Sequence, residues 1–269
     1  MGRKSIDSSF MIKQLFVFSF LLFSFFSKAQ PNTDSSITQA RFDKYYLTSF
    51  LKDYRNIFTS PFKPSVKKYT LAAAYGGTMY LLISHYDEKI QIFAQDNRSK
   101  CTNHLSTYVF EPMGQGIFPF MAIGLLYTEG MLWKNQKSKK VAMNAVKSFL
   151  IASSFAQLSK HIISRQRPLV SPPDANKWFM SNDNVSFFSG HTTTAFSMAT
   201  VFAEEYKSTV WVPVLAYTMA AGAGLSRINL NKHWASDVLT GALVGYLTGK
   251  LVVCQNNWGI KVVPRLIIQ

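Results

Sequence analysis

Six apolar segments of helical length dominate the chain between residues 69 and 253. Short polar segments separate them, and the alternation of polar and apolar residues that marks a half-buried strand is scarce. No repeat with a period of 20 to 50 residues is visible, which argues against solenoids and propellers. The pattern therefore predicts an all-α fold, a bundle of six helices. The expected helices span residues 69–85, 108–133, 141–163, 191–206, 208–225 and 233–253.

The composition leaves the relation of these helices to a membrane open. The 269 residues are 48% hydrophobic and only 16% charged, whereas soluble proteins contain about 25% charged residues. Three of the expected helices contain or overlap long uncharged stretches, 69–86, 112–128 and 208–226. The other helices hold only about a dozen uncharged residues in a row, and a span needs roughly 20. Both a polytopic membrane protein and a globular bundle outside the membrane fit this pattern.

The N-terminus has the features of a secretory signal. Arg3, Lys4 and Lys13 precede an apolar run at 15–26, and the small residues of Ser27-Lys28-Ala29 follow it. At about 12 residues the run is shorter than a membrane span. We therefore expect export of the chain with removal of residues 1–29, and an uncleaved anchor helix is the alternative.

Beyond the signal the chain divides into a polar leader at 30–68, a bundle domain at 69–255 and a tail at 256–269. The leader is expected to be exposed or to form one short amphipathic helix. If the signal is cleaved and all six helices span, the loop 164–190 is cytoplasmic and the basic segment 134–140 lies outside. That arrangement violates the positive-inside rule. It is avoided if one helix does not span, if the signal is uncleaved and one helix is miscounted, or if the domain is a globular periplasmic one.

The charge balance predicts an anionic partner. There are 29 basic and 14 acidic side chains, a formal net charge of +15, and removal of residues 1–29 leaves +12 because it takes four basic groups and one acidic group. Nucleic acid, anionic lipid and a phosphorylated substrate are all compatible with this charge. Two cysteines, Cys101 and Cys254, exclude a disulfide-dense scaffold and a four-cysteine zinc site, and leave one disulfide possible.

The first of three polar clusters runs from Lys160 to Arg167 and Pro168. Seven residues make nearly two helical turns, so both cations share one face if the helix continues. Pro168 disfavours helical backbone at Arg167 and can turn its guanidinium toward the helix end. The two cations could converge on one oxyanion, although basic residues at a helix C-terminus often only complement its dipole.

The second cluster is Ser189-Gly190-His191 at the start of an expected helix. Ser189 is a suitable N-cap, and Gly190 leaves a backbone N–H bare at a helix N-terminus, where an anion is favoured. His191 lies in the first turn, within reach of that anion. The alternative is an ordinary capped helix start that carries a histidine.

The third cluster contains Ser226, Arg227, His233 and Asp237. His233 and Asp237 are four residues apart, so on a helix the carboxylate can orient one imidazole nitrogen and leave the other for acid–base chemistry. A metal bound by this pair would need a third ligand, and no segment rich in His or Cys provides one.

A stripe of glycines marks the last expected helix. Gly241, Gly245 and Gly249 recur every four residues, so they share one face on which another helix can approach closely. We interpret the stripe as a sign of tight packing within the bundle.

In order, the three clusters read Lys-x6-Arg-Pro, Ser-Gly-His and Ser-Arg-x5-His-x3-Asp. This string resembles the three-part signature of the type 2 phosphatidic acid phosphatase and vanadium haloperoxidase superfamily. The gaps of 19 residues from Pro168 to Phe188 and of 34 from His191 to Ser226 are within the range of that family, and the helical region matches its six-helix bundle. The family usually has proline before Ser-Gly-His, where this chain has Phe188. This difference concerns the shape of the turn.

The resemblance implies a phosphatase mechanism. His191 would attack phosphorus to give a phosphohistidine, and His233, oriented by Asp237, would protonate the leaving alkoxide and then activate water. The scheme requires neither a metal nor another cofactor. The phosphate oxygens would be held by Lys160, Arg167, Ser189, Gly190 and Arg227.

Three functions are compatible with these residues. The first is a phosphatase of the cell envelope that acts on a lipid phosphate or diphosphate, with an anionic membrane surface as a further partner. The second is a soluble periplasmic acid phosphatase of broad specificity. The third is a vanadate-dependent haloperoxidase, or a noncatalytic relative that binds phosphorylated lipid. No basic and aromatic motif for nucleic acid is present, so we expect no nucleic-acid partner.

Overall fold

A computed structural model describes residues 42, 44–59, 66–180 and 184–255. The predicted signal (1–29) and tail (256–269) lie outside these residues. Within them the structure is helical, and the only bridge of β type in the described part joins Gln166 and Val185. The predicted all-α class is therefore confirmed. The elements are α2 (Lys44–Thr59), α3 (Val66–Leu81), η2 (Leu82–Tyr86), α4 (Asp87–Asp96), α5 (Lys100–His104), η3 (Leu105–Phe110), α6 (Glu111–Gly114), α7 (Ile117–Leu132), α8 (Gln136–Ile163), α9 (Gly190–Glu205), α10 (Trp211–Asn229) and α11 (Ala235–Gln255).

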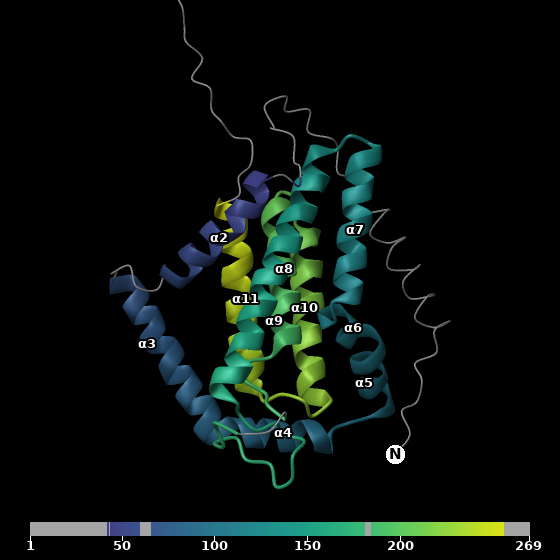
Figure 1. The fold of residues 1–269 in the computed structure, drawn as a ribbon. Helices are drawn as coiled ribbons and strands as arrows, with labels where there is room; N and C mark the ends of the chain where they lie inside the picture. Colours follow the sequence, from purple (N-terminus) through teal and green to yellow (C-terminus); the bar gives the residue numbers. More distant parts are fainter. Residues whose placement is uncertain (1–41, 43, 60–65, 181–183, 256–269) are drawn as a thin grey trace, which may run out of the picture.

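The bundle is arranged around α9, which packs against α8, α10 and α11. α7 lies on the outer side of α8, and α4 crosses the lower end of the bundle in Figure 1. α3 leans away from the bundle and approaches it again at its lower end (Figure 1). Consecutive helices from α7 onward run in opposite directions, so the loops 164–189 and 230–234 lie at the same end.

Glycines allow α11 to approach the backbone of α9, as the sequence predicted. A β-carbon at Gly241 would lie 2.7 Å from the carbonyl oxygen of Ser189, and one at Gly245 would overlap the carbonyl oxygen of Thr193. Gly249 makes the same kind of contact one turn further on. Because real β-carbons do not come so close to oxygen, this pair of helices needs glycine at these positions.

The observed helices extend the predicted set. α8 begins at Gln136 instead of 141, and the single helix expected at 108–133 is divided near residues 115–116 into a π-helical and short α-helical part and α7. α4 and α5 occupy a region for which no helix was expected. In the predicted leader, α2 is the helix that the sequence left open, and its Tyr46 and Asp53 are buried.

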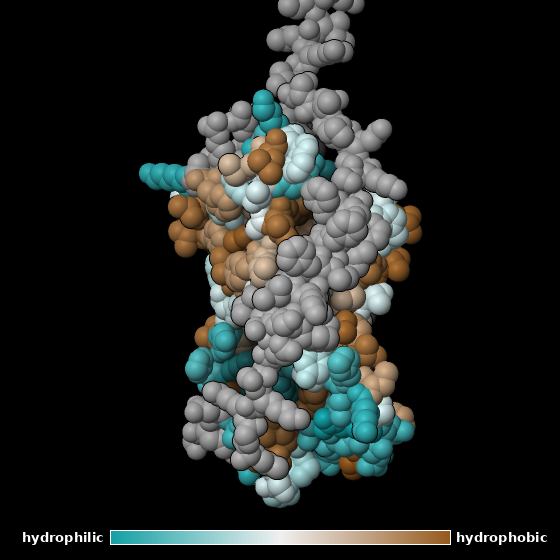
Figure 2. Space-filling view, turned by 90° about the vertical axis from the view of Figure 1, so that its right-hand side faces the viewer, coloured by the Kyte–Doolittle hydropathy of each residue, from teal (hydrophilic) through white to brown (hydrophobic). Residues whose placement is uncertain are grey.

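Two helices, α8 and α11, are long and apolar enough to cross a membrane. The bent pair Lys100–Gly114 and Phe118–Leu132 is also long and apolar enough if its two parts form one span. Figure 2 shows hydrophobic side chains on both sides of the grey trace in the upper half of one face, with hydrophilic ones at the lower end and at the very top. Large apolar side chains such as Leu132, Val214 and Leu225 are more than half exposed. Length, composition and surface therefore favour a membrane-embedded bundle.

Candidate active site

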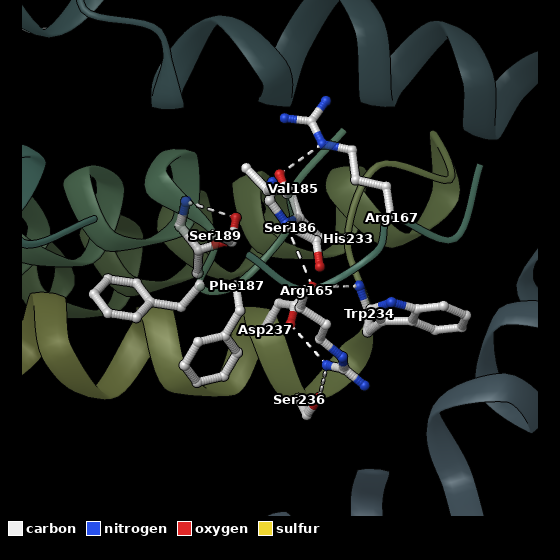
Figure 3. Close-up of polar contacts among 12 residues, drawn as sticks. Arg165, Arg167, Val185, Ser186, Phe187, Ser189, His233, Trp234, Ser236 and Asp237 are labelled. Carbon is white, nitrogen blue, oxygen red and sulfur yellow. Dashed lines mark hydrogen bonds and ion pairs between the residues drawn. The ribbon is translucent and has the colours of Figure 1, made fainter. Parts of the chain in front are cut away.

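The three polar clusters of the sequence meet at the lower end of the bundle. The backbone N–H of Ser189 donates to the carbonyl of Asp237 at 3.1 Å, which joins the second cluster to the third. Lys160 Nζ lies 3.8 Å from the position that a β-carbon of Gly190 would take, which brings the first cluster to the second. Segments as far apart in the chain as the end of α8 and the start of α11 thus form one site (Figure 3).

The first cluster converges by a different geometry from the predicted one. α8 ends at Ile163, and Ser164 takes a left-handed conformation with φ of 45°, so Lys160 and Arg167 do not share a continuous helix face. Arg167 lies in the following loop, where its Nε donates to the carbonyl of Val185 at 2.9 Å. Lys160 and Arg167 form no ion pair with an acidic side chain of the described residues, so their positive charge is available to an anion.

The second cluster forms the N-terminus of α9, and the predicted cap is present. The Ser189 hydroxyl oxygen accepts from the backbone N–H of Thr192 and, at 2.8 Å, from the Thr192 hydroxyl. Gly190 is the first residue of the helix, so its N–H is among those without an intrahelical acceptor. The Phe187–Phe188 peptide bond that precedes the cluster is cis.

His191 has an unpaired nitrogen in a positively charged surrounding. Its Nε2 is buried and has no hydrogen-bond partner among the described residues. Burial lowers the pKa of His191 far below its usual value, and the charge of Arg227 acts in the same direction. The imidazole is therefore neutral at physiological pH, and an unprotonated nitrogen can act as a nucleophile.

His233 and Asp237 are adjacent, although His233 precedes α11 instead of lying on it. His233 Nδ1 is 3.6 Å from Asp237 Oδ2, which is longer than a normal hydrogen bond and of the kind that often tightens when substrate binds. Burial lowers the pKa of His233 to about 4, and the Asp237 carboxylate opposes that shift. The same Asp237 oxygen accepts from the backbone N–H of Trp234 at 3.0 Å.

Glu111 is a member of the site that the sequence analysis missed. Its Oε1 accepts from Arg227 Nη1 at 2.6 Å and from Lys232 Nζ at 2.7 Å. Glu111 is therefore an acidic group between two cations that an oxyanion would also contact. No local sequence signal marks Glu111, because it lies more than 100 residues before both partners and outside the three polar clusters.

Among the residues that the structure describes, no group of three or more His, Cys, Asp or Glu side chains could hold a metal ion. Cys101 and Cys254 are exposed free thiols, so the disulfide that the sequence allowed is not formed. Of the aromatic residues beside the site, Phe188 is buried, and Trp178 packs over the guanidinium of a further arginine, Arg165.

Comparison with known proteins identifies the domain. A family model described as the PAP2 superfamily matches residues 141–261, which include all eight predicted site residues. This part of the chain thus matches the PAP2 superfamily. The finding confirms the resemblance that the three clusters indicated.

Two curated relatives match parts of the chain. A lipid A 1-phosphatase of Porphyromonas gingivalis is 57% identical over 67 residues, which are 24% of this chain and 15% of the relative. The bacitracin transport permease protein BcrC of Bacillus licheniformis is 30% identical over 133 residues, 49% of this chain and 63% of the relative. The matched segments thus span less than two thirds of either relative.

A solved structure has the same fold. The transmembrane PAP2 type phosphatidylglycerolphosphate phosphatase of Bacillus subtilis superposes with a TM-score of 0.51 at 21% identity, over 68% of this chain and 94% of that one. The likeness supports the arrangement of helices over about two thirds of the chain.

Proposed function

We propose that this PAP2 protein is a phosphoric ester hydrolase that removes phosphate from a lipid monoester or diphosphate of the cell envelope, without a metal. One observation carries the proposal. The buried, unpaired Nε2 of His191 lies in a surrounding whose charged groups include Lys160, Arg227 and Lys232. A neutral nucleophile among cations is suited to attack on a phosphate, whose negative oxygens the cations stabilise.

In the first step, His191 Nε2 forms a bond to phosphorus while the bond from phosphorus to the lipid oxygen breaks. Protonated His233 gives its proton to the leaving alkoxide. The phosphate oxygens are held by Lys160, Arg167, Arg227, the Ser189 hydroxyl and the Gly190 N–H. An arginine fork can contact two of these oxygens at once.

In the second step, water attacks phosphorus and the bond to His191 Nε2 breaks, which releases inorganic phosphate. His233 accepts the proton of the water and is ready to donate again. Its low pKa in the empty site rises when the dianionic phosphate enters, because a nearby negative charge favours the imidazolium. Asp237 stabilises that imidazolium.

A lipid substrate is supported by two features of the chain. Its apolar surface and two helices of spanning length would place the site near the membrane surface. One relative is a lipid A 1-phosphatase and the solved neighbour is a phosphatidylglycerolphosphate phosphatase. Lipid A 1-phosphate is therefore the first substrate to test. A soluble phosphatase of broad specificity is less well supported, because it would not need this apolar exterior.

We further propose that the chain is exported and that the site faces the periplasm. The basic segment 134–140 lies at the end of the bundle opposite the site, so the positive-inside rule favours a cytoplasmic position for it. α3 has 16 residues, about 24 Å of helix, whereas the hydrocarbon core is about 30 Å thick. If α3 is the helix that does not span, a cleaved signal and an outward-facing site are compatible.

The test is phosphate release by purified full-length protein in detergent, with lipid A, phosphatidic acid, phosphatidylglycerophosphate, undecaprenyl diphosphate and a soluble ester as substrates and a chelator present. We expect hydrolysis of at least one lipid, its loss in His191→Gln, and wild-type rates in His161→Gln, a variant of an exposed histidine. Hydrolysis that survives His191→Gln would overturn the proposal. Bromination of a dye with peroxide and vanadate would instead indicate a haloperoxidase.

A further inference from the structure

Arg165 is a fully buried arginine with a partner for each nitrogen of its guanidinium. Its Nε donates to the carbonyl of Ala175 at 2.9 Å, and Nη1 donates to Ser236 Oγ and Asp237 Oδ1 at 2.7 and 2.8 Å (Figure 3). Nη2 donates to Asp87 Oδ2 at 2.6 Å. The guanidinium thus connects the carboxylate beside His233 to a second carboxylate that belongs to none of the three clusters.

Asp87 reaches this position from α4, which crosses the end of the bundle. It is fully buried. Its Oδ1 accepts from the backbone N–H of Ser236 at 2.9 Å, and its Oδ2 accepts from the Ser236 hydroxyl as well as from Arg165. Asp87 therefore caps the first turn of α11 from outside that helix and neutralises Arg165 at the same time.

Two tryptophans enclose the cation. The Arg165 Cζ lies 4.6 Å from the ring centroid of Trp178 and 5.4 Å from that of Trp234. Trp234 is fixed in turn, because its Nε1 donates to the carbonyl of Gln166 at 2.7 Å. With water excluded, charges at these distances interact more strongly than at the surface, and each buried ion requires its partner.

The charges of Asp237, Arg165 and Asp87 determine the electrostatic environment of His233. Arg165 holds Oδ1 of Asp237 and the Trp234 N–H holds Oδ2, so the plane of the carboxylate that faces His233 is fixed. Arg165 alone would cancel the negative charge of Asp237. Asp87 restores one net negative charge to the group, so an imidazolium at His233 still meets a negative environment.

We propose that Arg165 and Asp87 are positioning residues of the hydrolase, which act through Asp237 to set the orientation and the basicity of His233. The inference rests on the proposed function of His233 as the acid and base. Asp87 increases the basicity of His233, and Arg165 decreases it while holding Asp237 in place. The charged and titratable groups that face His233 are Asp237 on α11, Arg227 on α10, Arg167 in the loop after α8 and His191 on α9.

The test measures the pKa of His233 directly, by NMR titration of carbon-labelled histidine in the full-length protein in detergent with saturating inorganic phosphate. The chain has five histidines, and the His233 signal is identified by its loss in His233→Gln. Asp87→Asn is expected to lower the pKa of His233, and Arg165→Gln to raise it. Both variants should lower kcat about 10- to 100-fold, as loss of outer positioning groups does, with KM changed less than kcat.

Two further variants separate positioning from general damage. Ser236→Ala removes the hydroxyl between Arg165 and Asp87 without a change of charge, so it should lower kcat modestly and leave the pKa of His233 in place. Asp53→Asn disrupts another buried ion pair, with Lys147 at 2.9 Å, remote in sequence from the site, and should change neither quantity.

Shifts of the His233 pKa in the same direction for Asp87→Asn and Arg165→Gln, or no shift in either, would overturn the inference. If Arg165→Gln does not fold, the His233 pKa in Asp87→Asn is compared with that in Ser236→Ala. Only Asp87→Asn changes a charge, so only this variant should lower the pKa. The titration needs no turnover, so it tests this inference separately from the proposed function. Failure of the proposed function would appear as hydrolysis that does not depend on His191.

Discussion

Gly114 lies against His191 so closely that a β-carbon at Gly114 would be 2.5 Å from His191 Cβ and 2.9 Å from its Cδ2. The carbonyl of Gly114 also accepts from the hydroxyl of Thr194, one turn further along α9, at 3.2 Å. The short helix α6 thus forms a support for the first turn of α9. The position of the proposed nucleophile depends on a glycine 77 residues earlier in the chain.

Gly114→Ala is therefore expected to move His191. A displacement of about 1 Å can reduce the rate about 100-fold, so we expect kcat for phosphate release to fall by that order while the protein still folds. Gly124→Ala is the matched control, since a β-carbon at Gly124 in α7 would meet nothing within 4 Å. Equal activity of the two variants would show that α6 does not position His191.

Gly245→Ala should destabilise the bundle. Its β-carbon would overlap the carbonyl oxygen of Thr193, so α9 and α11 would have to separate. Overpacking of this kind costs about 1–3 kcal/mol, which we expect to appear as a lower melting temperature in detergent. Gly77→Ala, in open space on α3, should leave the melting temperature unchanged or raise it, because alanine favours helix. A melting temperature of Gly245→Ala at the wild-type value would contradict the close packing.

Glu111→Gln should strengthen the binding of anions. The glutamine amide is neutral, so Arg227 and Lys232 lose the negative charge that they share and both interact more strongly with a phosphate or vanadate ion. We expect the inhibition constant of orthovanadate to fall about tenfold. Glu204→Gln, which removes the negative charge paired with Lys250, is the control and should not change the inhibition constant. Weaker inhibition in Glu111→Gln would mean that Glu111 orients Arg227 instead of competing for it.

Stability should decrease as the pH falls through the range set by His233. The pKa of His233 is lowered by burial from 6.5 to about 4, so between these values the unfolded chain binds more protons than the folded one. The free energy of unfolding therefore falls with falling pH, by about 3 kcal/mol over the whole range. The loss of melting temperature on acidification should be smaller in His233→Gln. An equal loss in both proteins would show that His233 is not the group responsible.

The sequence predicted residues that the structure brings together at the proposed phosphate site, because short, fixed spacings place most of them there. Ser189, Gly190 and His191 are consecutive, and a helix N-terminus follows from a serine cap before an apolar helix. Where the prediction assumed a continuous helix it was less accurate. Lys160 and Arg167 belong to one site, yet a left-handed residue at 164 and the loop that follows bring them together.

The groups behind the site could not be predicted in this way. Asp87 and Arg165 are 78 residues apart. In the sequence around it, each resembles an ordinary surface charge at a helix end. Only the tertiary arrangement, with α4 crossing the end of α8 and α11, buries both and makes them partners. Similarly, Tyr46 of α2 donates to the carbonyl of Met143 at 2.8 Å, a contact that the polar composition of the leader did not indicate.

The most direct test of the account is a rapid-quench experiment with a lipid substrate that carries a radioactive phosphate, such as labelled lipid A 1-phosphate or the best substrate of the panel. We predict that a single turnover labels the protein with an acid-labile, alkali-stable phosphate at His191, and that the label is absent in His191→Gln. Phosphate release without any labelled intermediate, at a rate that His191→Gln leaves unchanged, would contradict the central claim that His191 is the nucleophile.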